Sequence, residues 1–181
     1  MTLMVFTALI LLPFCVPILP VETFISYSGW IGIQPPREER HRFGVLPQHF
    51  ADRFGWKEKA DAIGQVFQRL TPQEQSDCAV FAGNYGEAGA IEFYGARYGI
   101  KHVLSPHNNY WLWGPGDATG EVVIILGGDL ESKQREFEQV EVVGQIVCGY
   151  CMPYESDLKI YLCRHLRGSL KELWPRLKAF S

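Results

Sequence analysis

The sequence lacks several patterns that identify enzymes. It contains no G-x-G-x-x-G dinucleotide loop, no phosphate loop with a Lys-Ser/Thr pair, no H-E-x-x-H motif and no serine-nucleophile elbow. No acidic pair stands out as a glycosidase site. Basic residues are not in excess either, because 17 Lys and Arg face 20 Asp and Glu. Non-specific nucleic-acid binding needs a basic face, so we expect no nucleic-acid partner.

Charge is absent from the N-terminal stretch. Residues 1–21 contain no charged side chain, and a helix of about 20 apolar residues crosses a bilayer. A signal peptide would have a basic start and a small-x-small cleavage site, and neither is present. A helix buried in a core is the third interpretation. We expect a transmembrane helix over 1–21, despite Pro13, Pro17 and Pro20, because membrane helices tolerate proline better than soluble ones.

The rest of the chain has the length and composition of one domain. With 181 residues, of which 47% are hydrophobic, it can bury a single core. We expect a linker over 22–48, in which Gln34-Pro35-Pro36 resists regular structure and Arg37–Arg42 is a mixed charge cluster. A soluble α/β domain is expected over 49–181.

Helical and strand-like patterns alternate through this domain. Apolar runs predict strands at 78–82, 102–104, 121–126, 140–147 and 158–163, and helical spacing predicts helices at 56–70, 87–98, 130–137 and 169–177. The last two strands suit an antiparallel edge pair. The sequence therefore predicts an α/β fold: a small mixed, mostly parallel sheet with flanking helices, preceded by one hydrophobic transmembrane helix.

Several helix boundaries carry local signals. Thr71-Pro72-Gln73-Glu74 and Ser169-Leu170-Lys171-Glu172 both read as capping boxes. Pro175 should kink or split the last helix. In the helix over 56–70, the polar side chains Lys57, Glu58, Lys59 and Asp61 are predicted to face solvent.

The segment 79–114 holds the candidate binding site. Its order of strand, glycine turn, helix, strand and polar-aromatic loop is how α/β domains place a site beyond the strand ends. Asn84 and Glu87 stand three residues apart where the helix begins. One interpretation is a helix cap; the other makes Glu87 an acid, a base or an acceptor for a sugar hydroxyl. The two interpretations are compatible.

The stretch from His107 to Trp113 reads HNNYWLW. It offers amides and an imidazole beside flat apolar faces, the mixture that recognises sugars and lipid-phosphate headgroups. The alternative is a loop packed over the core by its own tryptophans. We predict no cofactor and no catalytic residue. The predicted ligand-binding residues are Asn84, Glu87, His107, Asn108, Asn109, Tyr110, Trp111 and Trp113.

Cys148-Gly149-Tyr150-Cys151 leaves three interpretations open. The pair forms a structural disulfide or plain buried thiols, or it forms a zinc site with Cys163 and His165. A redox dithiol is disfavoured, because Met152-Pro153 prevents the helix start that would lower the pKa of the first cysteine. We expect both cysteines in a loop between two strands, close to Cys163.

Three strings carry a family resemblance: GNYGEAGAIEFYGARYG, HNNYWLWGPGDATGEVVIILGG and CGYCMPYE. They resemble the C-terminal extracytoplasmic domain of bacterial membrane glycosyltransferases of family 39, which include protein O-mannosyltransferases and aminoarabinose transferases. The resemblance covers nearly the whole chain. It implies a domain on the extracytoplasmic side of the inner membrane, attached to upstream membrane helices or the bilayer. It also implies contact with a polyprenyl-phosphate sugar or its acceptor.

The sequence departs from the family in one respect. Family members are thought to use acidic residues in an early extracytoplasmic loop, and this chain has no counterpart, so no catalytic residue carries over. The resemblance implies an accessory domain, or fragment, of a transferase, and we expect the isolated chain to transfer no sugar. The alternatives are a free-standing, membrane-anchored extracytoplasmic ligand-binding protein and a thiol protein built on Cys148 and Cys151.

Overall fold

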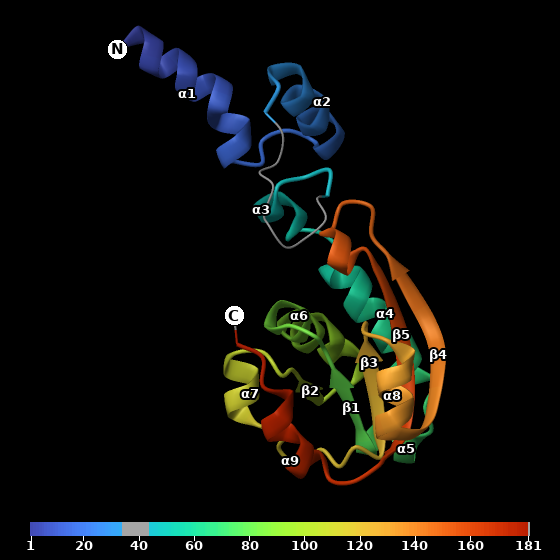
Figure 1. The fold of residues 1–181 in the computed structure, drawn as a ribbon. Coiled ribbons are helices and arrows are strands. Elements are labelled where there is room, and N and C mark those ends of the chain that lie inside the picture. Colours follow the sequence, from blue (N-terminus) through green and yellow to red (C-terminus); the bar gives the residue numbers. More distant parts are fainter. Residues whose placement is uncertain (34–43, 181) are drawn as a thin grey trace. The chain divides into compact units, whose positions relative to one another are not determined.

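The computed structural model describes residues 1–33 and 44–180, which divide into two units (Figure 1). The N-terminal unit comprises Met1–Phe54 and Tyr150–Tyr154. The α/β unit comprises Gly55–Gly149 and Glu155–Ser181. The candidate site residues all lie in the α/β unit.

The N-terminal unit contains helices α1 (Thr2–Cys15), α2 (Val21–Ile31) and α3 (Gln48–Ala51). The predicted single helix over 1–21 is therefore wrong. Helix α1 ends where Val16, directly before Pro17, has extended dihedral angles (φ −130°, ψ 131°), because proline disfavours a helical residue before it. Fourteen residues span about 21 Å, short of the roughly 30 Å of a bilayer core. Within 1–33 and 44–180, no helix is long and apolar enough to cross a membrane.

Aromatic packing holds the N-terminal unit together. The ring of Phe24 stacks on that of Phe50, with 4.5 Å between ring centroids, and both side chains are buried. Tyr150 donates a hydrogen bond to the Glu22 carboxylate at 2.7 Å. The predicted linker over 22–48 thus begins with helix α2. Gln34-Pro35-Pro36 and the whole Arg37–Arg42 charge cluster lie outside the described residues.

The α/β unit is built on a five-stranded mixed sheet with the order β2-β1-β3-β5-β4. Its strands are β1 (Cys78–Phe81), β2 (His102–Leu104), β3 (Val122–Leu126), β4 (Phe137–Val147) and β5 (Asp157–Leu166). Strand β1 pairs in parallel with β2 and β3, whereas β5 pairs antiparallel with β3 and β4. The α/β class and the antiparallel edge pair are confirmed. A mostly parallel sheet is wrong, because β4 and β5 form one long hairpin that needs no crossover helix.

The helical elements of this part of the chain are α4 (Trp56–Gln68), α5 (Pro72–Asp77), α6 (Tyr85–Gly95), η1 (Ala96–Tyr98), α7 (Asn109–Trp113), α8 (Leu130–Glu136), η2 (Pro153–Glu155), α9 (Leu170–Leu173) and η3 (Trp174–Leu177). The capping box at Thr71 is confirmed, with both of its hydrogen bonds present. Ser169 starts α9 without a side-chain cap, so that prediction is wrong. Pro175 splits the last helix into α9 and η3, as predicted.

The two faces of the sheet are covered by different helices (Figure 1). Val80 and Ile124 face α4 and α6, where they share a core with Ile63, Phe67 and Ile91. Their neighbours along the strands point to the opposite face, because successive side chains of a strand alternate. There they meet α8, α9 and η3. The short central strands are therefore buried on both faces, which explains their continuous apolar sequence.

Glycine allows a close approach between α4 and the segment after α6. A methyl group at Gly64 would lie 2.2 Å from a ring carbon of Tyr98. The ring cannot move away freely, because the Tyr98 hydroxyl donates to Asp61 at 3.1 Å and Arg97 pairs with the same carboxylate. Only glycine fits this contact without displacing the ring.

We predict that Gly64→Ala destabilises the α/β unit by about 1–3 kcal/mol, because overpacking costs more than the gain in helix propensity returns. Gly89→Ala is the matched control. A methyl group there meets only the Tyr110 hydroxyl, at an ordinary 3.8 Å, so we expect no loss of stability. Urea unfolding of both variants measures the difference, and equal stabilities would contradict the prediction.

Candidate functional site

The candidate site begins where β1 ends. Because β2 and β3 flank β1 in parallel, the loops after these strands lie at one edge of the sheet, where open α/β sheets bind ligands. At the start of α6, the Asn84 side chain accepts a hydrogen bond from the Glu87 backbone N–H at 2.9 Å. This confirms the helix-cap interpretation of Asn84. The Glu87 carboxylate has other partners.

Glu87 belongs to a buried cluster of three charged side chains. The Lys59 ammonium donates to Glu155 Oε2 at 2.8 Å and to Glu87 Oε1 at 3.2 Å. Asn84 Nδ2 donates to the other oxygen of Glu155 at 3.3 Å. Lys59 is fully buried, and Glu87 and Glu155 are 4% and 5% exposed. We call Lys59, Glu87 and Glu155 the buried triad.

The triad carries one positive and two negative charges. Burial raises the pKa of Glu87, and the nearby Glu155 carboxylate raises that pKa further, while Lys59 opposes both effects. The ring of Trp56 covers the ammonium of Lys59, with 4.8 Å from the nitrogen to the ring centroid. Such an arrangement is expensive to bury, so each charge depends on its partners. Glu87 is therefore held as a structural group and is not an exposed acid or base.

Sequence reasoning missed two members of this triad. Lys59 is predicted to face solvent, yet it points into the protein, where two carboxylates from distant segments pair with it. Glu155 is 68 residues from Glu87 in sequence, and no local pattern marks it. The only available signal is that Lys59 stands three residues after Trp56, on the side of the helix that carries the apolar spacing.

Helix α7 lies along one face of α6. Tyr85, Gly89 and Glu92 follow one another at helical spacing. The ring of Tyr85 lies 5.1 Å from that of His107, and the Tyr110 hydroxyl donates to the Glu92 carboxylate at 2.6 Å. The predicted loop and the start of α6 are thus brought together.

Two tryptophans of α7 have different roles. The indole N–H of Trp111 donates to the Trp174 carbonyl at 3.0 Å, and the Trp174 indole donates back to the Trp111 carbonyl at 2.9 Å. Trp111 also packs against the core under α9, so the structural interpretation holds for this residue. Trp113 is 68% exposed, and its ring lies 4.7 Å from that of Tyr110, measured between centroids.

The two asparagines lie at the turn into α7. Asn108 has a positive φ of 51° with a ψ of −125°, a backbone conformation that residues other than glycine rarely adopt. Its backbone N–H donates to the carbonyl of Ala179 at 3.1 Å, so the C-terminal tail fixes the turn. Asn109 is exposed at the first position of the helix. The eight predicted site residues therefore divide into four groups: the cap at the start of α6 (Asn84 and Glu87), the turn into α7 (His107, Asn108 and Asn109), the structural Trp111, and the ring pair of Tyr110 and the exposed Trp113.

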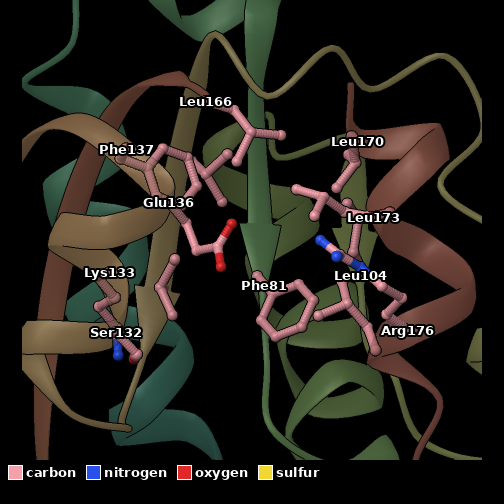
Figure 2. A pocket seen from close by; sticks show the side chains of 13 residues that line it. Phe81, Leu104, Ser132, Lys133, Glu136, Phe137, Leu166, Leu170, Leu173 and Arg176 are labelled. Atoms are coloured by element: carbon pink, nitrogen blue, oxygen red, sulfur yellow. The ribbon is translucent and has the colours of Figure 1, made fainter. Parts of the chain in front are cut away.

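A cavity of about 490 Å³ lies on the sheet face opposite α4 and α6 (Figure 2). The side chains around it come from the central strands, α8, α9 and η3. None of the eight predicted site residues lines it. Sequence reasoning missed this cavity, because its lining residues read simply as core positions.

The cysteines do not assemble a metal site. Cys148 and Cys151 are disulfide-bonded, and they lie in the loop between β4 and β5, as predicted. Cys163 is opposite Val140, seven residues or roughly 23 Å along β4 from the loop, so the expected proximity is wrong. In residues 1–33 and 44–180, no group of three His, Cys, Asp or Glu residues is arranged to hold a metal ion.

Comparison of the chain with protein-family models, with curated proteins and with solved structures gives no match. The family resemblance of the sequence strings therefore stays a prediction.

The raised pKa of Glu87 predicts a pH-dependent effect of Glu87→Gln. The folded state holds the proton of Glu87 more tightly than the unfolded chain. The stability that the protonated form contributes is therefore complete below the ordinary value of 4.5 and is lost as the pH rises through the folded pKa. Relative to the native protein, Glu87→Gln should gain stability over that rise. Urea unfolding at several pH values measures it.

Glu58→Gln is the control, because Glu58 is an exposed carboxylate on the same helix as Lys59. The stability of Glu58→Gln relative to the native protein should not increase over the same pH range. A difference in stability between Glu87→Gln and the native protein that stays constant with pH would contradict the assignment.

We also predict that Lys59→Met, which leaves both carboxylates without their counter-charge, lowers the free energy of unfolding by about 3–5 kcal/mol.

Burial also predicts the reactivity of the thiols. It raises the pKa of Cys78 to about 12 and that of Cys163 to about 11, whereas Cys15 is exposed. At pH 8, an alkylating reagent should modify only Cys15 in the folded protein and all three free thiols in urea. Mass spectrometry of the peptides reads out each site, and rapid labelling of native Cys163 would refute the prediction.

Proposed function

We propose that the α/β unit is an accessory domain of a polyprenyl-phosphate-sugar-dependent membrane glycosyltransferase. In this proposal the surface formed by Tyr85, Glu92, His107, Tyr110 and Trp113, which we call the α6–α7 surface, contacts the sugar of the donor or acceptor. The domain supplies recognition, and the chemistry belongs to other parts of the transferase.

The observation that carries the proposal is the exposed aromatic surface beside hydrogen-bonding groups. Trp113 and Tyr85 are 68% and 56% exposed, and the Glu92 carboxylate and the His107 ring lie next to them. A flat apolar face binds the C–H side of a sugar ring, while a few oriented polar groups bind its hydroxyls. Tyr110 holds Trp113 and Glu92 together, so the surface is preformed.

The disulfide between Cys148 and Cys151 supports the proposed location. Disulfides persist in oxidising compartments and are rare in the cytosol. An extracytoplasmic location at the inner membrane agrees with this bond and with the resemblance of the sequence to the family.

An accessory role agrees with the state of Glu87. Sugar transfer from a lipid phosphate needs a base or electrostatic group at the acceptor and stabilisation of the leaving phosphate. The Glu87 carboxylate is buried and accepts a hydrogen bond from Lys59, and the Glu87 backbone N–H donates to Asn84 at the start of α6. The carboxylate is therefore not presented to an acceptor.

We predict that Trp113→Ala weakens the binding of a sugar ligand about 5- to 10-fold, because it removes a stacking face worth about 1–1.5 kcal/mol. Calorimetric titration of the full chain with a panel of methyl glycosides and a short-chain prenyl-phosphate sugar measures the effect. In a full-length relative that carries the upstream helices, the same substitution should lower transfer activity.

Leu112→Ala is the matched control, because Leu112 is 64% exposed on the same helix and carries no ring. Neither substitution should change stability by more than about 0.5 kcal/mol. Trp111→Ala serves a different purpose, since it breaks the reciprocal bonds to Trp174 and should destabilise the domain. Equal binding by Trp113→Ala and the native chain, or sugar transfer by the isolated chain, would refute the proposal.

A further inference from the structure

The cavity on the far side of the sheet is large enough to hold a small molecule. Its volume of about 490 Å³ lies within the range of about 300–1,000 Å³ typical of ligand pockets. It is well above the roughly 150 Å³ of engineered cavities that stay dry and bind small aromatic molecules. The cavity is partly open to solvent, so a ligand can enter it.

The depth of the cavity is apolar. Phe81, Val123 and Ile125 line its floor from the sheet side. Leu170 and Leu173 of α9 line one wall (Figure 2). An apolar floor of this kind binds an aliphatic or aromatic group and excludes water from it. The occupant must therefore carry a substantial apolar body.

The polar side chains of the cavity fall into two groups. Ser132 and Lys133 donate to the Asp129 carbonyl at 3.1 and 3.0 Å, so both are engaged at the start of α8. Glu136 and Arg176 are exposed and extend their charged ends toward the cavity from opposite walls (Figure 2). In the part of the chain that the structure describes, neither charged end forms a hydrogen bond or an ion pair.

These opposite charges select among ligands. A molecule with only an anionic end would pair with Arg176 but would be repelled by Glu136. A simple amine would pair with Glu136 but would be repelled by Arg176. A neutral hydrocarbon would fill the floor but would desolvate both charges without pairing them. A ligand that carries both charges next to an apolar body satisfies all three parts of the cavity.

We propose that this cavity binds a free α-amino acid with a large apolar side chain. Its carboxylate pairs with the Arg176 guanidinium, which suits a two-pronged contact with a carboxylate. Its ammonium pairs with Glu136, and its side chain lies against Phe81 and Ile125. The site is separate from the α6–α7 surface and does not depend on the proposed transferase role.

Three related ligands test the proposal on the full chain. L-Phenylalanine carries both charges, 3-phenylpropionate lacks the ammonium and phenethylamine lacks the carboxylate. We expect L-phenylalanine to bind with a dissociation constant of about 1 mM or lower in calorimetric titration. Each truncated ligand should bind about 10- to 100-fold more weakly, because it loses a charge-assisted hydrogen bond.

Substitutions at the two charges should act selectively. Glu136→Gln should weaken L-phenylalanine about 10-fold or more and leave 3-phenylpropionate unchanged or tighter. Arg176→Gln should weaken L-phenylalanine and 3-phenylpropionate but not phenethylamine. Arg135→Gln is the control, because Arg135 is an exposed residue of α8 that does not line the cavity. Circular dichroism and urea unfolding verify that each variant is folded.

Several outcomes would overturn the proposal. Binding of 3-phenylpropionate as tightly as L-phenylalanine would identify an anion or fatty-acid site, and equal binding of phenethylamine would identify an amine site. Absence of binding by L-phenylalanine, L-tryptophan and L-leucine to a folded chain would exclude free apolar amino acids. Loss of binding in Arg135→Gln as large as in Arg176→Gln would place the ligand elsewhere.

Discussion

Lys59 is the residue on which three distant segments of the α/β unit depend. Its ammonium lies within 3.2 Å of carboxylates from α6 and from the loop before β5, in a place that water does not reach. The start of α6, the end of the β4–β5 loop and the N-terminal part of α4 are thereby held in one arrangement. Removal of the Lys59 ammonium would leave two buried carboxylates without a counter-charge, which strongly destabilises a folded protein. The turn after β1 keeps its shape because this contact is made.

Because the contacts of Lys59 fix the position of α6, the α/β unit presents two separate surfaces with different chemistry. On one side, α6 is held so that its Tyr85–Glu92 face receives α7, and the exposed ring of Trp113 stands beside polar groups. On the other face of the sheet, α8 and the segment with α9 and η3 leave an apolar space between them. The first suits a sugar lying on an open surface, and the second suits a compact amphiphilic molecule. Both arise because each strand presents alternate side chains to opposite faces.

Local patterns predicted most elements of the α/β unit. The predicted strands at 102–104 and 121–126 correspond to β2 (His102–Leu104) and β3 (Val122–Leu126), and the predicted split at Pro175 is present. These patterns failed on the balance of the sheet, because β5 pairs antiparallel with β3 as well as with its predicted partner β4. They also failed on the N-terminal apolar stretch, where helix α1 ends before Pro17. The cap at Asn84 was predictable because its hydrogen bond spans three residues. The partners of Glu87 were not, because Lys59 and Glu155 are 28 and 68 residues away in sequence.

The sequence by itself determined the α/β class, the glycine turn after β1, the helix caps at Thr71 and Asn84 and the loop position of Cys148 and Cys151, since each depends on neighbouring residues. Only the tertiary structure decided that Trp111 is structural while Trp113 is exposed, because the difference is made by Trp174 across the domain. It also decided the cavity between α8 and η3. A cavity is the space left by elements packed from different parts of the chain, and no local pattern records how far apart they come to rest.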